Sequence, residues 1–401
     1  MTYPRLLLLG AGLTSCLHGV HGLEAKELLS YSFGRTTFQP RVSLGSTYSD
    51  NITYNNRVPL SDVTLSIAPG IGFLYGKPGE NVLTAGYQLE QIFYMDHNEF
   101  DALNHSFQMT GHVEGSKLAY DGLVSIQHLS TLLGGSLSDP LLFGTSLQAD
   151  RFVYRTTHML DYTLSEKTGV YAGPSFDALD YEDGTPLFDY NTLFGVAGFR
   201  YVLTPKTELF GEMRYGQSGV DPNRSIDPKG PSSTFVGGSV GAKFDFSARI
   251  TGIVKVGYEA RSYSNDNDAP SEPVVSADIS YKLSPKTSLS LNYSRFLSAS
   301  LQAVSETAVV DSFGLTATQQ IGNTGKFGAN AGLAYQTTSY QSNVTTARDD
   351  ERIFGSIGFF YKFQLWLKAG LTYSHTQYTS SLPTVLEYTE NKVALALSVG
   401  Y

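Results

Sequence analysis

The stretch KLSPKTSLSLNYS, residues 282–294, joins two runs of alternating polar and apolar residues through a short turn. After the turn, Leu289 and Leu291 alternate with serines. Pro285 suits the first central position of a tight turn because its ring fixes the backbone angle φ that this position requires. A side-chain period of two is the period of a β-strand. The stretch therefore predicts a β-hairpin whose corner exposes Lys286 to water.

Related turns recur along the chain, for example LSEKTGV at 164–170 and VLTPKTELF at 202–210. Successive turns are mostly about 40 residues apart, a period that also suits a β-propeller. A propeller blade, however, packs four short strands into each period. Here each period holds two long alternating runs, separated by a polar connection. The repeat therefore indicates consecutive long β-hairpins that pair side by side in one sheet.

The alternating runs are long enough to cross a membrane. A tilted transmembrane β-strand needs about 9–11 residues. We count about 18 candidate strands, an even number, as in bacterial single-chain barrels. The clearest runs are Val63–Phe73, Leu83–Phe93, Phe152–Leu164, Val236–Phe246, Ile250–Ala260, Val275–Leu283, Phe327–Tyr335, Ile353–Phe363 and Leu365–Tyr373.

Composition separates a membrane barrel from a soluble β-sandwich, which shows the same period of two. Only 16% of the residues are charged, and the polar faces carry Ser, Thr, Asn and Gly rather than the Lys and Glu of a water-facing sheet. No apolar run after the N-terminus approaches the roughly 18 residues of a spanning helix. We therefore predict an all-β fold, a transmembrane antiparallel up-and-down β-barrel of about 18 strands with short periplasmic turns and longer extracellular loops.

The N-terminal residues 1–22 have the layout of a secretory signal peptide, with Arg5, an apolar core and small residues before the expected cleavage after Gly22. A lipoprotein cleavage box that ends at Cys16 is an open alternative. Either reading implies export, and we expect a barrel in the outer membrane of a Gram-negative bacterium. The expected segments are the cleaved signal peptide 1–22, a short periplasmic segment 23–37 and the barrel 38–401.

Tyrosines lie at or near the ends of the expected strands, where amphipathic rings form girdles at the headgroup level of a membrane. A general preference of tyrosine for strands explains some of them. The candidates for these girdles are Tyr48, Tyr75, Tyr94, Tyr215, Tyr258, Tyr281, Tyr293, Tyr335, Tyr361 and Tyr373.

The final stretch NKVALALSVGY, residues 391–401, alternates strictly and ends on an aromatic residue. It resembles the C-terminal signature of bacterial outer-membrane proteins, which the barrel assembly machinery recognises. We therefore expect this machinery, outer-membrane lipid and lipopolysaccharide as partners. The residues of the expected assembly signal are Val393, Leu395, Leu397, Val399 and Tyr401.

Three stretches carry a resemblance that covers essentially the whole chain after the signal peptide. They are YSDNITYN at 48–55, APGIGFLYGKPGENVLTAGYQLEQIFYMD at 68–96 and SPKTSLSLNYS at 284–294. With them the chain resembles the Putative beta-barrel porin 2 family of outer-membrane proteins. The resemblance implies an outer-membrane barrel with a poorly defined substrate and, for some members, genes near exopolysaccharide systems.

The interior of such a barrel is wide enough for water and small solutes. Charged residues of both signs alternate with the apolar positions, so we expect them to line the pore. The alternative is that they pair with one another and stiffen the wall. The candidates are Arg151, Arg155, Asp161, Glu212, Arg214, Lys255, Glu259, Arg261, Asp278 and Lys368.

The connection 130–150 is unusually apolar for an extracellular loop. Apolar surface of this size avoids water, so we hypothesise that the loop folds into the lumen as a constriction. Packing over the rim or against a neighbouring subunit is the alternative. The expected constriction residues are Leu132, Leu133, Asp139, Leu141, Leu142 and Phe143.

The histidines after the signal peptide lie in no recognisable catalytic motif, so we expect neither an enzyme nor a cofactor or metal site. SNDNDAPSE at 264–272 is rich in oxygen ligands for calcium, but a solvated loop tip is the preferred interpretation. The net charge of −9 argues against a nucleic-acid partner, because phosphate binding needs a basic face.

The expected function is passive diffusion of small hydrophilic solutes through a porin-like channel. The alternative is a role in exopolysaccharide or surface-polymer export, with periplasmic polysaccharide-export proteins as partners. A structural barrel with a blocked lumen is a lower alternative.

Overall fold

The computed structural model describes most of the chain. The described residues are 30–77, 81–132, 148–182, 189–220, 232–263, 270–299, 307–341, 348–382 and 387–400. The expected signal peptide 1–22 lies outside them.

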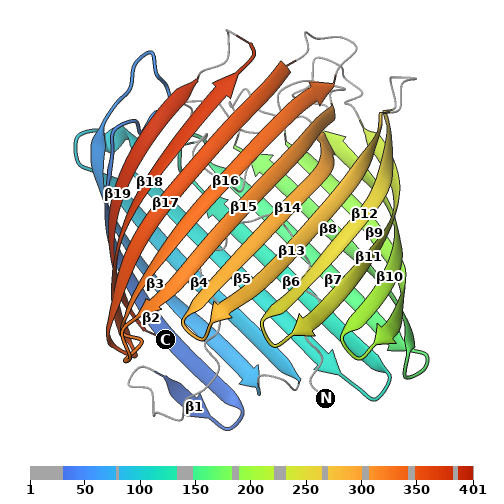
Figure 1. Cartoon of the computed structure of the whole chain (residues 1–401). Coiled ribbons are helices and arrows are strands. Elements are labelled where there is room, and N and C mark those ends of the chain that lie inside the picture. Colours follow the sequence, from blue (N-terminus) through green and yellow to red (C-terminus); the bar gives the residue numbers. More distant parts are fainter. Residues whose placement is uncertain are drawn as a thin grey trace.

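The structure is a tilted β-barrel with almost no helix (Figure 1). Its 19-stranded sheet comprises a three-residue strand, β1, and a closed ring of 18 longer strands. A 3₁₀ turn, η1 (Asn98–Phe100), lies between β4 and β5. The strands are β1 (Tyr31–Phe33), β2 (Thr36–Ser49), β3 (Asp62–Gly76), β4 (Val82–Tyr94), β5 (Ala102–Glu114), β6 (Leu118–Leu129), β7 (Arg151–Thr163), β8 (Thr168–Tyr181), β9 (Tyr190–Thr204), β10 (Thr207–Val220), β11 (Ser233–Ser247), β12 (Ile250–Tyr263), β13 (Ser271–Ser284), β14 (Thr287–Ala299), β15 (Thr307–Ile321), β16 (Phe327–Gln341), β17 (Arg348–Gln364), β18 (Leu367–Ser380) and β19 (Tyr388–Val399).

The ring closes between the first and last long strands. Every strand from β2 onward pairs antiparallel with the next one in the sequence, and β19 pairs with β2 from Val399↔Val42 to Lys392↔Ser49. A closed ring leaves no sheet edge, so the ladder satisfies the backbone N–H and C=O groups that lipid could not. The predicted barrel and its strand number are confirmed.

The turn at Pro285 has the form that the sequence predicts. Ser284 pairs with Thr287 across the corner, so Pro285 and Lys286 form the turn between β13 and β14. The Oγ of Ser284 lies 2.8 Å from the Oγ1 of Thr287. Such short turns gather at the barrel end where β19 finishes, and the longer connections lie at the other end (Figure 1). By this asymmetry the short-turn end is periplasmic.

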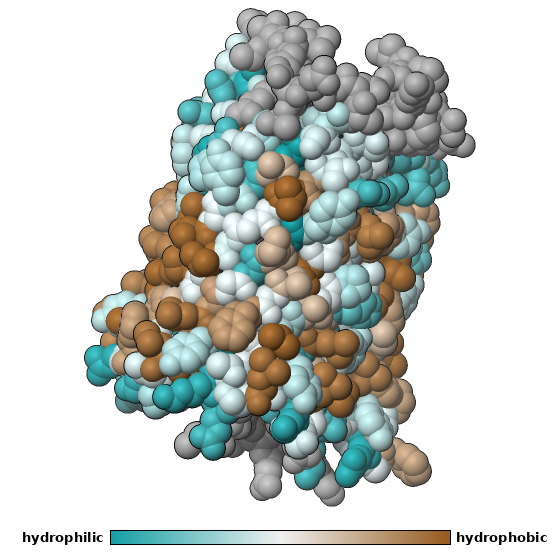
Figure 2. All heavy atoms as spheres, turned by 90° about the vertical axis from the view of Figure 1, so that its right-hand side faces the viewer, coloured by the Kyte–Doolittle hydropathy of each residue, from teal (hydrophilic) through white to brown (hydrophobic). Residues whose placement is uncertain are grey.

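The outer face is apolar over a broad band. Along β10, Met213 is 67% exposed and Tyr215 is also exposed, whereas their neighbours turn inward. Figure 2 shows apolar side chains across the middle of one side of the barrel and polar ones near both ends. This face matches the lipid-facing band of an outer-membrane barrel. Among the described residues, no helix has the length and apolar character to cross a membrane.

The expected assembly signal lies on the closing strand. Val393, Leu395 and Leu397 are exposed on the outer face of β19. Tyr401 lies outside the described residues. The recognition of this strand by the assembly machinery stays a prediction.

Several boundaries differ from the sequence-based expectation. Leu365 and Trp366 form the turn between β17 and β18, so the strand predicted from residue 365 begins at Leu367. The strands extend further at their extracellular ends than predicted. For example, β17 begins at Arg348 rather than at Ile353. Polar residues continue the ladder there beyond the apolar stretch that marked the strand in the sequence.

The N-terminal boundary and one tyrosine also need correction. β2 begins at Thr36, and the preceding β1 pairs with its first residues, so part of the expected segment 23–37 already belongs to the sheet. Tyr94 was expected in an outer girdle, but it packs against a buried cluster that contains Tyr54 and Tyr388. The alternation along β4 decides this, because Phe93 takes the outward position.

Candidate functional site

The lumen is the candidate site, and strand alternation decides which side chains enter it. In β10 the exposed Met213 and Tyr215 face outward, so Glu212 and Arg214 face inward. The ladder carries this orientation to neighbouring strands, because directly paired residues share a face. Extended around the ring, it places the sequence-predicted charged residues inward: Arg151, Arg155, Asp161, Glu212, Arg214, Lys255, Glu259, Arg261, Asp278 and Lys368.

The inward charges of β10 and β12 form a connected set. The Nζ of Lys255 donates to the Oε1 of Glu212 at 2.7 Å. Glu259, only 3% exposed, lies between two cations, 3.5 Å from the Nη1 of Arg214 and 3.3 Å from the Nη2 of Arg261. Charge-assisted bonds of this kind fix side chains that alone would be mobile.

Aromatic rings hold the same guanidinium groups from the other side. The Cζ of Arg214 lies 4.2 Å from the ring centroid of Phe194 and 4.7 Å from that of Phe235. Arg261 lies 4.9 Å from the same Phe235 ring. Planar guanidinium groups stack well on aromatic faces. The cations of this wall therefore have fixed positions in the lumen.

A second set of ion pairs lies on β7 to β9. Arg200 donates two hydrogen bonds of 2.8 Å to the carboxylate of Asp161. The Nε of Arg155 donates to Asp177 at 2.6 Å. The two readings of the charged residues are thus compatible, because the pairs stiffen the wall and still present their charges to the interior.

Arg151 and Lys368 both contact neutral groups of the wall. The Nη1 of Arg151 donates to the backbone carbonyl oxygens of Thr131 and Ala149. The Nζ of Lys368 lies 4.8 Å above the Phe360 ring. Their charges reach opposite ends of the lumen, because Arg151 begins β7 near the extracellular end and Lys368 is the second residue of β18, near the periplasmic end.

The connection between β2 and β3, residues 50–61, turns into the lumen. Tyr54 adopts a positive φ of 52°. Its ring packs edge-on against Tyr388 of β19 at 5.3 Å, and the Nζ of Lys392 lies 5.2 Å from the ring centroid. Tyr388 and Lys392 lie on the face of β19 opposite the exposed Leu395. The ring of Tyr54 therefore lies inside the barrel.

Hydrogen bonds anchor this connection to the extracellular end of β19. The Nδ2 of Asn51 donates to the carbonyl oxygen of Thr389 at 2.9 Å. The backbone N–H of Thr389 donates to the Oδ1 of Asn56 at 2.9 Å. The backbone N–H of Asn56 donates to the carbonyl oxygen of Glu387 at 3.0 Å. Anchors on both sides of Tyr54 keep its ring in the lumen.

Two apolar clusters narrow the extracellular half of the lumen. In the first, Tyr54 and Leu132 pack with Tyr378 and Tyr388. The second joins β8 to β15 and β16, which lie in the far and near walls of Figure 1. Its buried members are Ala149, Leu179, Tyr181, Ala308, Val310 and Tyr340.

The predicted constriction loop lies mostly outside the described residues. Leu132 is described and belongs to the first cluster, whereas Leu133, Asp139, Leu141, Leu142 and Phe143 are not described. The inward fold of this loop stays a prediction. Sequence reasoning missed the connection 50–61, although Ile52 and Tyr54 stand out as apolar residues in a polar loop.

Replacing Glu259 by Gln should destabilise the barrel and shift its ion selectivity toward anions. The change leaves Arg214 and Arg261 beside a neutral amide, and removing one partner of a buried ion pair costs about 3–5 kcal/mol. Urea unfolding in lipid vesicles measures the loss, and the reversal potential in a KCl gradient measures selectivity.

A double variant and a matched control make this test specific. Glu259→Gln combined with Arg261→Gln should recover part of the stability, because the excess cation is removed as well. Glu166→Gln changes an exposed turn residue and should behave as the wild type. Equal stability and reversal potential in Glu259→Gln and Glu166→Gln would contradict the assigned role.

Residues 151–401 match the model of the family described as Putative beta-barrel porin 2. No curated protein matches the chain significantly.

Solved structures of similar fold have low identity to this chain. Pseudomonas aeruginosa OpdO has 14% identity, a TM-score of 0.45 and coverage of 90% of this chain and 97% of that chain. OpdK from Pseudomonas aeruginosa, solved with vanillate, has 12% identity, a TM-score of 0.47 and coverage of 91% and 98%. Acinetobacter baumannii OccAB4 has 12% identity, a TM-score of 0.43 and coverage of 91% and 98%. Similarity at this level determines neither substrate nor mechanism.

The family match extends from β7 to the end of the chain, which is well over half of its length. It agrees with the even-numbered closed ring, the apolar outer band and the charged interior. The chain therefore belongs to the Putative beta-barrel porin 2 family and is a porin-like barrel of the cell outer membrane.

Proposed function

We propose that this barrel is a passive channel for small hydrophilic solutes. The observation that carries the proposal is the contrast between its two faces. The outer face is apolar, whereas the inner face carries ordered pairs of opposite charge such as Lys255 with Glu212 and Arg155 with Asp177. Fixed charges on the inner face, which does not contact lipid, favour water and polar solutes over apolar ones.

The lumen narrows near its extracellular end, and this supports an upper limit on the size of the solutes that pass. Tyr54 and Leu132 enter the lumen from two different connections and meet the wall residues Tyr378 and Tyr388. A solute that enters from outside passes this cluster, beside which Lys392 also lies, on its way to the ion pairs of β10 and β12. Large oligosaccharides should therefore be excluded.

Liposome swelling with sugars of graded size tests the proposal. Vesicles that contain the folded wild-type chain should swell with monosaccharides and more slowly, or not at all, with longer oligosaccharides. Vesicles with the same amount of heat-unfolded protein control for leakage. Equal rates in the two preparations for every sugar would refute passive diffusion.

A structural barrel with a closed lumen is the second candidate. It is favoured by the apolar cluster that joins Leu179 and Tyr181 of β8 to Val310 and Tyr340 of the opposite wall. Single-channel recording separates the two candidates, because a closed barrel shows no conductance steps in planar bilayers. Polymer export has no support from the family match or from the described residues, and no enzymatic activity is proposed.

A further inference from the structure

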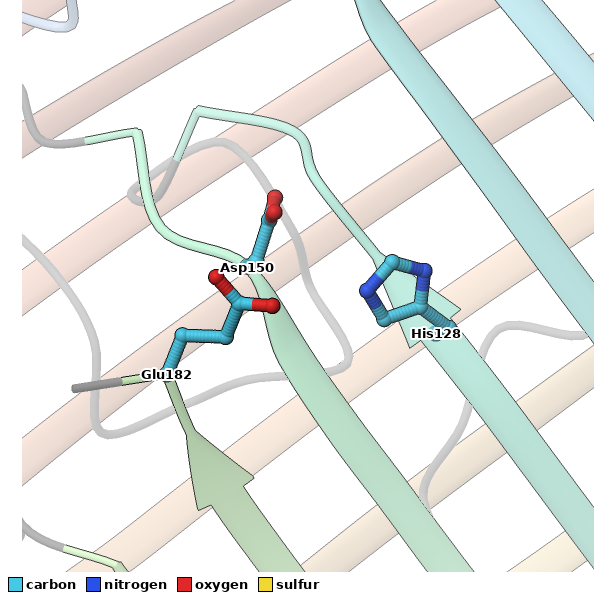
Figure 3. Close-up of side chains that lie close together, drawn as sticks. All are labelled: His128, Asp150 and Glu182. Carbon is cyan, nitrogen blue, oxygen red and sulfur yellow. The ribbon is translucent and has the colours of Figure 1, made fainter.

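His128, Asp150 and Glu182 converge near the extracellular end of the barrel (Figure 3). His128 comes from the end of β6, Asp150 directly precedes β7, and Glu182 directly follows β8. One potential ligand atom from each side chain lies within 4.8 Å of the other two. Three separate strands thus bring together one imidazole and two carboxylates.

The ladder fixes the backbone positions of these residues. The N–H of Glu182 donates to the carbonyl oxygen of Asp150 at 2.9 Å, which continues the β7–β8 pairing beyond Arg151↔Tyr181. Across β6 and β7, His128 pairs with Phe152, two residues from Asp150 and on the same face. Side chains on this diagonal lie close enough to interact.

The three side chains lie on the outer face. Ile126 precedes His128 by two residues on β6 and is exposed there, and Leu160 marks the outward positions of β7. The cluster is therefore separated from the lumen by the wall. It lies near the rim, where an outer-membrane barrel emerges from lipid into water and anionic headgroups.

Asp150 and Glu182 lie opposite each other across the β7–β8 ladder, so the cluster brings two carboxylates close together. Carboxylates directly opposite each other in an antiparallel pair repel. In the described part of the chain, the side chains of His128, Asp150 and Glu182 form neither hydrogen bonds nor ion pairs. Each therefore keeps a lone pair available for a metal ion.

The residues around His128 restrict its ring. The Phe152 ring lies 4.6 Å away and the His105 ring 5.9 Å away, centroid to centroid. His105 is itself held by a hydrogen bond of 2.8 Å between its Nδ1 and the hydroxyl of Tyr87. A ring packed in this way loses little freedom when it binds a metal ion, so less binding energy is spent on ordering.

We propose that His128, Asp150 and Glu182 bind a divalent transition-metal ion, with Zn²⁺ as the best fit. A mixed set of imidazole nitrogen and carboxylate oxygen suits zinc, whereas Mg²⁺ and Ca²⁺ take oxygen ligands almost entirely. Zinc–ligand distances of about 2.0–2.2 Å need ligand atoms slightly closer than they are here. Glu182 is the exposed member of the three, so its side chain is the one with most freedom to adjust. The site is independent of the proposed channel function, because it lies on the other side of the wall.

Calorimetric titration of Zn²⁺ into the EDTA-treated, detergent-solubilised full chain tests the site. The wild type should bind one Zn²⁺ at this site and bind Ca²⁺ and Mg²⁺ more weakly. His128→Asn, Asp150→Asn and Glu182→Gln should each weaken Zn²⁺ binding by roughly tenfold or more, because even the loss of a residue that only supports a metal ligand costs about this much. The heat-dependent gel mobility of each variant reports whether its barrel is folded.

His158→Asn is the matched control. This histidine also faces outward but is held by the Tyr120 hydroxyl at 2.7 Å and by Thr156 at 2.8 Å. The His158→Asn variant should therefore bind Zn²⁺ as the wild type does. X-ray absorption of the zinc-loaded wild type, which needs no variant, should show imidazole nitrogen and carboxylate oxygen around the metal. Binding unchanged by all three ligand substitutions, or a metal shell without imidazole, would overturn the proposal.

Discussion

Leu371→Arg should greatly reduce the amount of folded barrel. Leu371 lies outward near the middle of the bilayer span of β18 and is 48% exposed. Its ladder partners Phe359 and Leu395 are also exposed apolar residues. The new guanidinium would thus enter an apolar band without a counter-charge. Arginine on the lipid face costs about 2–4 kcal/mol at the midplane, a large share of the roughly 5–15 kcal/mol that keeps a protein folded.

The adjacent residue supplies the control for Leu371→Arg. Thr372 points into the lumen, where its side chain lies near Gly358 and Asn330. Thr372→Arg places the same charge one residue further along the strand, but in the interior of the barrel. Urea unfolding in lipid vesicles should show a large loss for Leu371→Arg and a small one for Thr372→Arg. Equal losses would contradict the assignment of the two faces.

Tyr54→Gly combined with Leu132→Ala should raise the single-channel conductance, by roughly twofold or more if this cluster is the narrowest point of the path. Both side chains enter the lumen from connections rather than from the wall. Their removal should therefore widen the path and leave the ladder intact. Glycine readily adopts the positive φ of 52° at position 54, so the backbone conformation should be kept.

Val58→Ala is the matched control for this variant. Val58 belongs to the same connection 50–61 but is 63% exposed, so its truncation should leave conductance unchanged. Planar-bilayer recordings of the three proteins provide the comparison. A double variant with wild-type conductance would show that Tyr54 and Leu132 do not limit the flow.

The alternating pattern was sufficient to predict the wall of this barrel. Which face a residue takes depends on a period of two, and this is a local property of the chain. The outward position of Leu371 and the inward position of Lys255 follow from it directly. The turn at Pro285 was equally predictable from the sequence, because proline restricts its own backbone angle φ. Tyr94 was misplaced because its position near a strand end was weighed above the alternation of β4.

By itself, the sequence determined an all-β chain, the number of its strands and the inward position of the ten candidate lumen charges. Only the tertiary structure decided that Glu259 sits between Arg214 and Arg261 and that Tyr54 reaches Tyr388. It alone also brought His128, Asp150 and Glu182 together. These contacts join residues far apart in the chain, and they depend on strand register and on the curvature of a closed ring. Local alternation carries no information about either.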